Sequence, residues 1–91
     1  MMKYLLVEDE RFAYEEIKRM MQALRADYQM IGWAESVEQA VGFLKQGNID
    51  LMIVDIRLSD GISFEIFEQC PIEIPVIFTT AYDEYALKAF K

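Results

Sequence analysis

The sequence contains no histidine and a single cysteine, Cys70. An internal disulfide is therefore impossible, and neither zinc-ligand clusters nor histidine-based catalytic triads can be assembled. Any metal ion bound by this chain must be held by oxygen atoms. The apolar stretch near the N-terminus, residues 4–7, is followed by acids and is too short for a signal peptide or a membrane span. We therefore expect a cytoplasmic protein.

Positive charge is also scarce, because nine basic residues face sixteen acidic ones for a formal net charge of −7. Surfaces that bind nucleic acids or anionic membranes need basic patches, so the charge argues against both partners within this segment and favours a cation or a basic partner. Solubility alone explains an acidic protein equally well. At 91 residues, of which 54% are hydrophobic, the chain suits one folded domain over residues 1–91.

Four short apolar segments predict the strands of a parallel sheet. They lie at residues 4–7, 28–34, 51–56 and 76–79. A helical pattern follows each of them after a short connection. Alternation of this kind predicts an α/β fold in which a doubly wound parallel sheet carries helices on both faces.

The helical segments carry their own boundary signals. Apolar side chains at helical spacing predict one buried stripe on the first helix, formed by Ala13, Ile17, Met20, Met21 and Leu24. Residues 36–39 form a capping box that opens a second helix, and Gly47 is placed to end it. We expect a short third helix at 64–69 and a last one that begins at Asp83 and runs to the end of the sequence.

Acidic residues stand where two of these strands end. Glu8 and Asp9 follow the first strand, and Asp55 ends the apolar part of the third. Binding sites of open parallel sheets lie at the carboxyl ends of the strands. If the first and third strands are neighbours, the three carboxylates converge, and each close pair repels by about 4 kcal/mol at an effective dielectric constant near 20.

A hard divalent cation, Mg²⁺ or Mn²⁺, would offset this repulsion. The chemistry left to such a site is a carboxylate nucleophile, Asp55, that forms an acyl phosphate beside the metal. Thr80, just past the fourth strand, is placed to donate a hydrogen bond to a phosphoryl oxygen.

Each residue alone has a simpler explanation: Asp9 as a helix cap, Glu8 as a solvated loop acid, Thr80 as a turn residue. Asp55 is harder to explain. Burying an ionised group at the end of a strand costs on the order of several kcal/mol of desolvation free energy unless the group is paired or hydrated. The occurrence of all four at successive strand ends favours the functional interpretation.

Three segments carry a resemblance to the response-regulator receiver domains of two-component signalling. They are residues 5–10, 50–56 and 77–86. The resemblance spans the whole chain, and residues 77–90 look like the LytR/AlgR subgroup. It implies a flavodoxin-like fold with strand order 2-1-3-4.

The resemblance also implies a role for each site residue. Asp55 would accept a phosphoryl group from a histidine kinase and so switch a downstream output, with DNA bound only through an output domain outside this sequence. Thr80 would be the switch hydroxyl and Ala81 the small residue beside the phosphoryl group. The metal ligands would be Glu8, Asp9, Asp55 and the backbone carbonyl of Arg57. Such a domain phosphorylates itself and is not a turnover enzyme.

The sequence departs from the family pattern in two ways. Receivers carry a fifth strand and helix, a lysine that pairs with the phosphoryl group and an aromatic switch residue, all beyond residue 91. We therefore expect an incomplete domain. Phosphoryl transfer should be slower without the positive charge of that lysine. We also expect self-association or strand exchange at the open edge of the sheet. Ser59, in a predicted turn at 59–61, and Ser63 stand where proline and glycine are common, which we interpret as mild loop variation.

Three other functions fit parts of the pattern. A haloacid-dehalogenase-like phosphotransferase needs a second aspartate two residues after the first, where this chain has Arg57. A nucleotide-binding dehydrogenase needs a glycine-rich loop after the first strand, which this sequence lacks. A pseudo-receiver that acts only in dimerisation or docking remains the open alternative.

Overall fold

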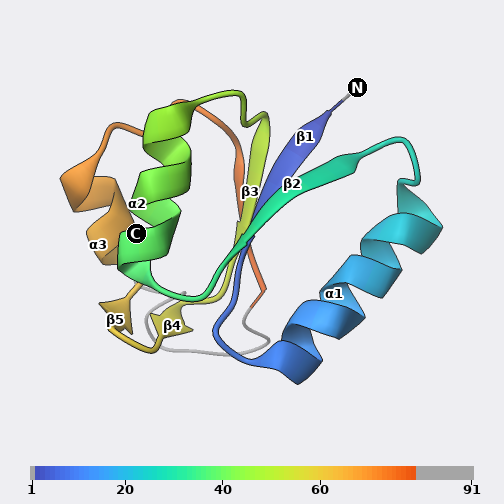
Figure 1. Ribbon diagram of the computed structural model, residues 1–91, viewed down its shortest axis with the longest axis horizontal. Helices are drawn as coiled ribbons and strands as arrows, with labels where there is room; N and C mark the ends of the chain where they lie inside the picture. The colour runs from blue at the N-terminus through green and yellow to red at the C-terminus, as the bar shows by residue number, and fades with distance from the viewer. Residues whose placement is uncertain (1, 80–91) are drawn as a thin grey trace.

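A four-stranded parallel sheet organises residues 2–79, which are the residues that the computed structural model describes (Figure 1). The strands are β1 (Lys3–Val7), β2 (Gln29–Ala34), β3 (Leu51–Val54) and β6 (Val76–Phe78). Their spatial order is β2-β1-β3-β6. Because β6 is the fourth of these strands along the chain, the predicted order 2-1-3-4 is confirmed. The helix predicted from Asp83 onward lies outside the described residues.

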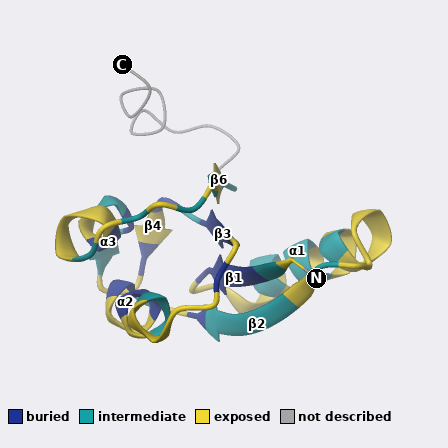
Figure 2. Ribbon diagram, turned by 90° about the horizontal axis from the view of Figure 1, so that it is seen from above, coloured by how far each residue is buried: buried dark blue, intermediate teal, exposed yellow. Residues whose placement is uncertain are grey.

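Helices cover both faces of the sheet, as predicted for a doubly wound fold. Helix α1 (Arg11–Leu24) lies on one face, and α2 (Val37–Gln46) and α3 (Phe64–Gln69) lie on the other (Figures 1 and 2). The predicted ends of α2 are confirmed: the Ser36 hydroxyl accepts a hydrogen bond from the Gln39 N–H at 3.1 Å, and Gly47 closes the helix at a φ of 80°. Among residues 2–79, no helix is long and apolar enough to cross a membrane.

The core consists of two apolar layers separated by the sheet. Successive residues of β1 point to opposite faces, so Leu5 and Val7 join the layer under α2 and α3, while Tyr4 and Leu6 join the layer under α1. All four are at most 2% exposed. Burial on both faces explains why β1 is a continuous apolar run in the sequence.

The buried stripe predicted for α1 is only partly correct. Ile17 and Met21 pack on the sheet together with Tyr14, but Met20 is 53% exposed and Leu24 is 76% exposed. Leu24 is the last residue of α1, and Met20 lines a hollow between α1 and β6.

The turn predicted at residues 59–61 is the tip of a small antiparallel hairpin formed by β4 (Arg57–Leu58) and β5 (Gly61–Ile62). Gly61 has a φ of 148°, which favours glycine. The tip is tied to the start of α2, because the Asp60 carboxylate accepts hydrogen bonds from the backbone N–H groups of Val37 (2.8 Å) and Glu38 (3.2 Å). The Ser59 hydroxyl donates to a backbone carbonyl in the same region, at 3.2 Å.

Replacing Asp60 with alanine should lower the free energy of unfolding by about 1 kcal/mol, the usual cost of losing a helix cap. Two backbone donors at the start of α2 lose their acceptor, and the hairpin loses its anchor. Urea denaturation followed by circular dichroism measures the change. Glu73→Ala, which removes one exposed carboxylate elsewhere, serves as the control for charge. Equal stability of the two variants would contradict the anchoring role.

Candidate functional site

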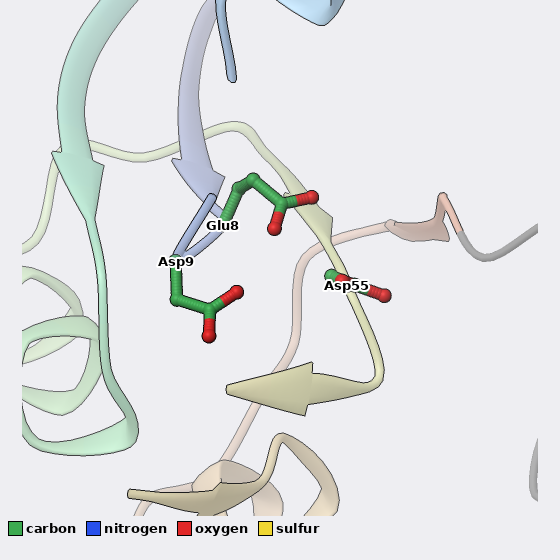
Figure 3. Close-up of side chains that lie close together, drawn as sticks. All are labelled: Glu8, Asp9 and Asp55. Carbon is green, nitrogen blue, oxygen red and sulfur yellow. The ribbon is translucent and has the colours of Figure 1, made fainter. Parts of the chain in front are cut away.

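The pairing of β1 with β3 brings the predicted acids together. The strands are parallel with Val7 opposite Val54, so Glu8 and Asp55 both leave the sheet at its carboxyl edge. The Asp55 N–H donates to the Val7 carbonyl at 3.0 Å, which continues the ladder into the site. One carboxylate oxygen from each of Glu8, Asp9 and Asp55 lies within 4.8 Å of the other two (Figure 3). The convergence expected from the sequence is confirmed.

The simpler explanations for Glu8 and Asp9 do not fit the structure. Helix α1 is capped at Glu10, with no side-chain hydrogen bond at the cap, so Asp9 is not the cap. Glu8 is only 4% exposed and is therefore not a solvated loop acid. Its carboxylate accepts a hydrogen bond from the Glu10 N–H at 3.2 Å, and the Asp55 carboxylate accepts one from the Ile56 N–H at 2.8 Å. Backbone donors thus orient two of the three acids.

The surroundings of Glu8 disfavour its charged form. Its pKa is raised from the ordinary 4.5 to about 7, chiefly because burial removes water from the carboxylate. The hydrogen bond from Glu10 lowers the pKa, while the neighbouring carboxylates of Asp55 and Asp9 raise it. Near neutral pH the cluster therefore retains protons on a group that would ionise fully in water.

The donor set of the cluster suits a hard divalent cation. All three side chains offer carboxylate oxygens, the ligands that Mg²⁺ and Mn²⁺ prefer. Their exposure is graded, with Glu8 buried, Asp55 half-buried and Asp9 exposed, so the cluster is open to solvent on one side. Glu8 and Asp55 also line the hollow between α1 and β6, whose volume is about 620 Å³.

Of the other predicted site residues, the structure describes only Arg57. Arg57 is exposed and begins β4, two residues after Asp55. Thr80 and Ala81 lie outside the described residues. Thr79, directly before them, donates its N–H to the Val54 carbonyl at 3.1 Å and lines the same hollow as Glu8 and Asp55. The residue that follows β6 therefore lies at the same hollow as the acidic cluster.

The sequence patterns did not identify two residues near the cluster. Trp33 donates its indole N–H to the backbone carbonyl of Glu8 at 2.6 Å, and Asp60 anchors the hairpin that follows Asp55. A lone tryptophan in an apolar strand signals that its N–H needs a partner. Only the fold shows which partner it finds.

Comparison with known proteins decides the family. The family model for the response regulator receiver domain matches residues 4–91, nearly the whole chain. The chain is a response regulator receiver domain. It therefore belongs to the signalling domains of two-component systems, and its α/β fold with a parallel sheet is the fold of this family.

Relatives place this receiver in a LytR-like subgroup, as the sequence predicted. It is 38% identical over 94 residues to the sensory transduction protein LytT of Bacillus cereus, covering 100% of this chain and 38% of LytT. It is 37% identical over 94 residues to LytR of Streptococcus agalactiae, covering 99% of this chain and 38% of that protein. The chain thus spans well under half the length of these relatives.

The solved structures agree with this fold. The non-phosphorylated receiver domain of HemR from Leptospira biflexa superposes with a TM-score of 0.76 at 26% identity. The match covers 99% of this chain and 74% of the HemR domain. The agreement therefore extends over the sheet and over the helices on both of its faces.

The raised pKa of Glu8 predicts how stability depends on pH when divalent cations are absent. Between pH 4.5 and about 7 the folded chain keeps a proton on Glu8 that the unfolded chain has lost, so this group contributes a free energy of unfolding that decreases as pH rises through that window. Urea denaturation at a series of pH values measures it. In Glu8→Gln the decrease should become smaller. The same pH dependence in both proteins would show that Glu8 ionises normally.

Proposed function

We propose that this receiver domain accepts a phosphoryl group on Asp55 from a histidine kinase, beside a divalent cation. The observation that carries the proposal is the convergence of three carboxylates within 4.8 Å at the carboxyl edge of the sheet. An oxygen of Asp55 forms the new bond to phosphorus while the bond from phosphorus to the kinase histidine nitrogen breaks, and that nitrogen keeps the bonding electrons. The product is an aspartyl phosphate.

The cation of this proposal is Mg²⁺ or Mn²⁺. Glu8, Asp9 and Asp55 would hold it through their carboxylates and Arg57 through its backbone carbonyl. When bound, the cation neutralises charge on the phosphoryl oxygens, which is the main requirement of phosphoryl transfer. Thr80 would bind a phosphoryl oxygen through its hydroxyl, and Ala81 would leave room beside it. The chain's own part is to orient Asp55 through the Ile56 N–H.

In this proposal the domain is a cytoplasmic switch and not a turnover enzyme, because the phosphoryl group stays on the domain's own side chain. The switch would control an output elsewhere in a longer regulator. Regulation of transcription is the output we propose, on the basis of the similarity to LytT and LytR. DNA would then be bound by that other part of the protein, since the net charge of −7 disfavours DNA binding by these residues.

Beryllium fluoride with Mg²⁺, a mimic of the aspartyl phosphate, tests the proposal. Amide resonances of Asp9, Asp55 and Thr80 should shift in nitrogen–proton NMR spectra, because the mimic binds the acceptor carboxylate beside the cation. Asp55→Asn should abolish the shifts that depend on beryllium fluoride. Arg57→Ala should keep them, because a backbone carbonyl survives the substitution. Unchanged spectra of the native chain would sink the phosphoacceptor proposal and favour a docking role.

A second copy of the chain is also proposed as a partner. Within residues 2–79, β6 forms one edge of the sheet, and no strand pairs with its outer side. Ile77 on this strand is 51% exposed, and Met20 across the hollow is 53% exposed. An apolar strand edge of this kind favours pairing between chains.

Ile77→Lys should therefore reduce self-association, because a charged side chain at a strand edge blocks pairing. Sedimentation equilibrium across a range of protein concentrations measures the average mass. Gln69→Lys, which adds the same charge at an exposed position on α3, is the matched control and should associate like the native chain. A native chain that stays monomeric at high concentration would rule out the homodimer.

A further inference from the structure

Strand β2 holds the peptide groups on both sides of Glu8. The Glu8 N–H donates to the Ala34 carbonyl at 2.9 Å, and the Glu8 carbonyl accepts the indole N–H of Trp33 at 2.6 Å. The first bond continues the β1–β2 ladder. The second is made by a side chain, at the point where the ladder ends and the acidic loop begins. The direction in which the Glu8 side chain leaves the sheet is thus fixed by β2.

A register shift in β2 explains how Trp33 reaches this position. Tyr4 pairs with Met30, but Leu5 pairs with Gly32, so Ile31 is an extra residue in the ladder. Met30 and Ala34 would share a face in a regular strand, yet Met30 packs on the α1 side and Ala34 on the α2 side. The irregularity re-aims the residues after it. It turns Trp33 to the α1 side of the sheet.

On that side Trp33 stacks against Tyr14 of α1. The ring centroids are 3.8 Å apart, and the ring planes differ by 10°. Tyr14 lies in the first turn and a half of α1, which begins three residues after Glu8. One indole therefore contacts both ends of the segment that carries Glu8 and Asp9: a hydrogen bond at its start and a stacked ring just beyond its end. Stacked aromatic pairs of this kind contribute stability beyond the area that they bury.

We propose that Trp33 is a positioning residue for the cation site, acting through the backbone carbonyl of Glu8. The inference rests on the proposed cation binding and names a residue that the binding depends on. Outer partners of metal ligands orient those ligands, and their loss usually weakens metal affinity without removing any ligand. Trp33 plays this part from an edge strand that supplies none of the three carboxylates.

Trp33→Phe tests the proposal because it keeps a ring that can stack on Tyr14 and removes only the N–H donor. Mn²⁺ affinity, measured from the electron paramagnetic resonance signal of the free ion, should fall about tenfold, the lower end of the usual effect of losing an outer partner. Tyr14→Leu removes the stack and keeps the donor, and it should also weaken Mn²⁺ binding. Phe43→Leu, a loss of packing on the opposite face of β2, is the matched control.

Thermal stability separates positioning from packing. All three variants should melt at lower temperature, but Phe43→Leu should bind Mn²⁺ within about twofold of the native affinity when all are measured well below their melting temperatures. Native affinity in Trp33→Phe would overturn the inference and leave the cation site intact. Failure of the native chain to bind Mn²⁺ would overturn the site itself, and the inference with it.

Trp33 also provides a measurement that needs no variant. It is the only tryptophan in the chain, so its fluorescence reports on this one contact. Its emission should change as Mg²⁺ is added, with the midpoint found by an independent binding measurement, because cation binding fixes the carbonyl that the indole contacts. Emission that stays constant up to saturation would contradict the proposed coupling, even if Trp33→Phe failed to fold.

Discussion

The parallel pairing of β1 with β3 is the constraint on which the rest of this receiver depends. Both strands are buried on both faces, so their register cannot shift without moving apolar side chains out of the two core layers. Because Val7 is fixed opposite Val54, the residues that follow them, Glu8 and Asp55, must lie side by side at the carboxyl edge of the sheet. The acids come together because the apolar residues before them pack in only one way.

Such a meeting of carboxylates is unfavourable by itself, and the surrounding backbone reduces its cost. Amide N–H groups donate to the side chains of Glu8 and Asp55, and the peptide groups that flank Glu8 bond to β2. The pKa of Glu8 is raised all the same, chiefly because burial disfavours its charged form, although the hydrogen bond from the Glu10 N–H acts in the opposite direction. The three carboxylates suit a divalent cation, which would relieve their mutual repulsion.

Much of this arrangement could be predicted from the sequence. The strand order, which makes β1 and β3 neighbours and so brings Glu8, Asp9 and Asp55 together, was expected from the resemblance to receiver domains. The strand positions, the ends of α2 and the acids at the strand ends follow from local patterns. These features depend on hydrophobic periodicity and on residues adjacent in the chain. The prediction succeeded where a residue type has one common structural role, as serine does at the start of a helix, where Ser36 caps α2.

The features that were missed depend on contacts between distant segments. Trp33 lies 25 positions from the carbonyl that it binds, and its direction is set by a register shift that leaves no signature in the hydropathy of β2. Asp60 caps α2, which begins 23 positions earlier, so no local capping motif predicts this contact. The exposure of Met20 follows from its position in the hollow between α1 and β6. Periodicity along a single segment carries none of this information.

The side-by-side register of β1 and β3 also limits which genetic changes the domain can tolerate. Loss or gain of one codon within either strand would preserve its hydropathy, yet it would exchange the two faces of every later residue in that strand and displace its terminal acid by one position. A similar change in the loop between α1 and β2, where the side chains are mostly exposed, would leave the pairing register of β1 and β3 unchanged. Insertions and deletions among natural variants should therefore collect in that loop and be rare in the two central strands.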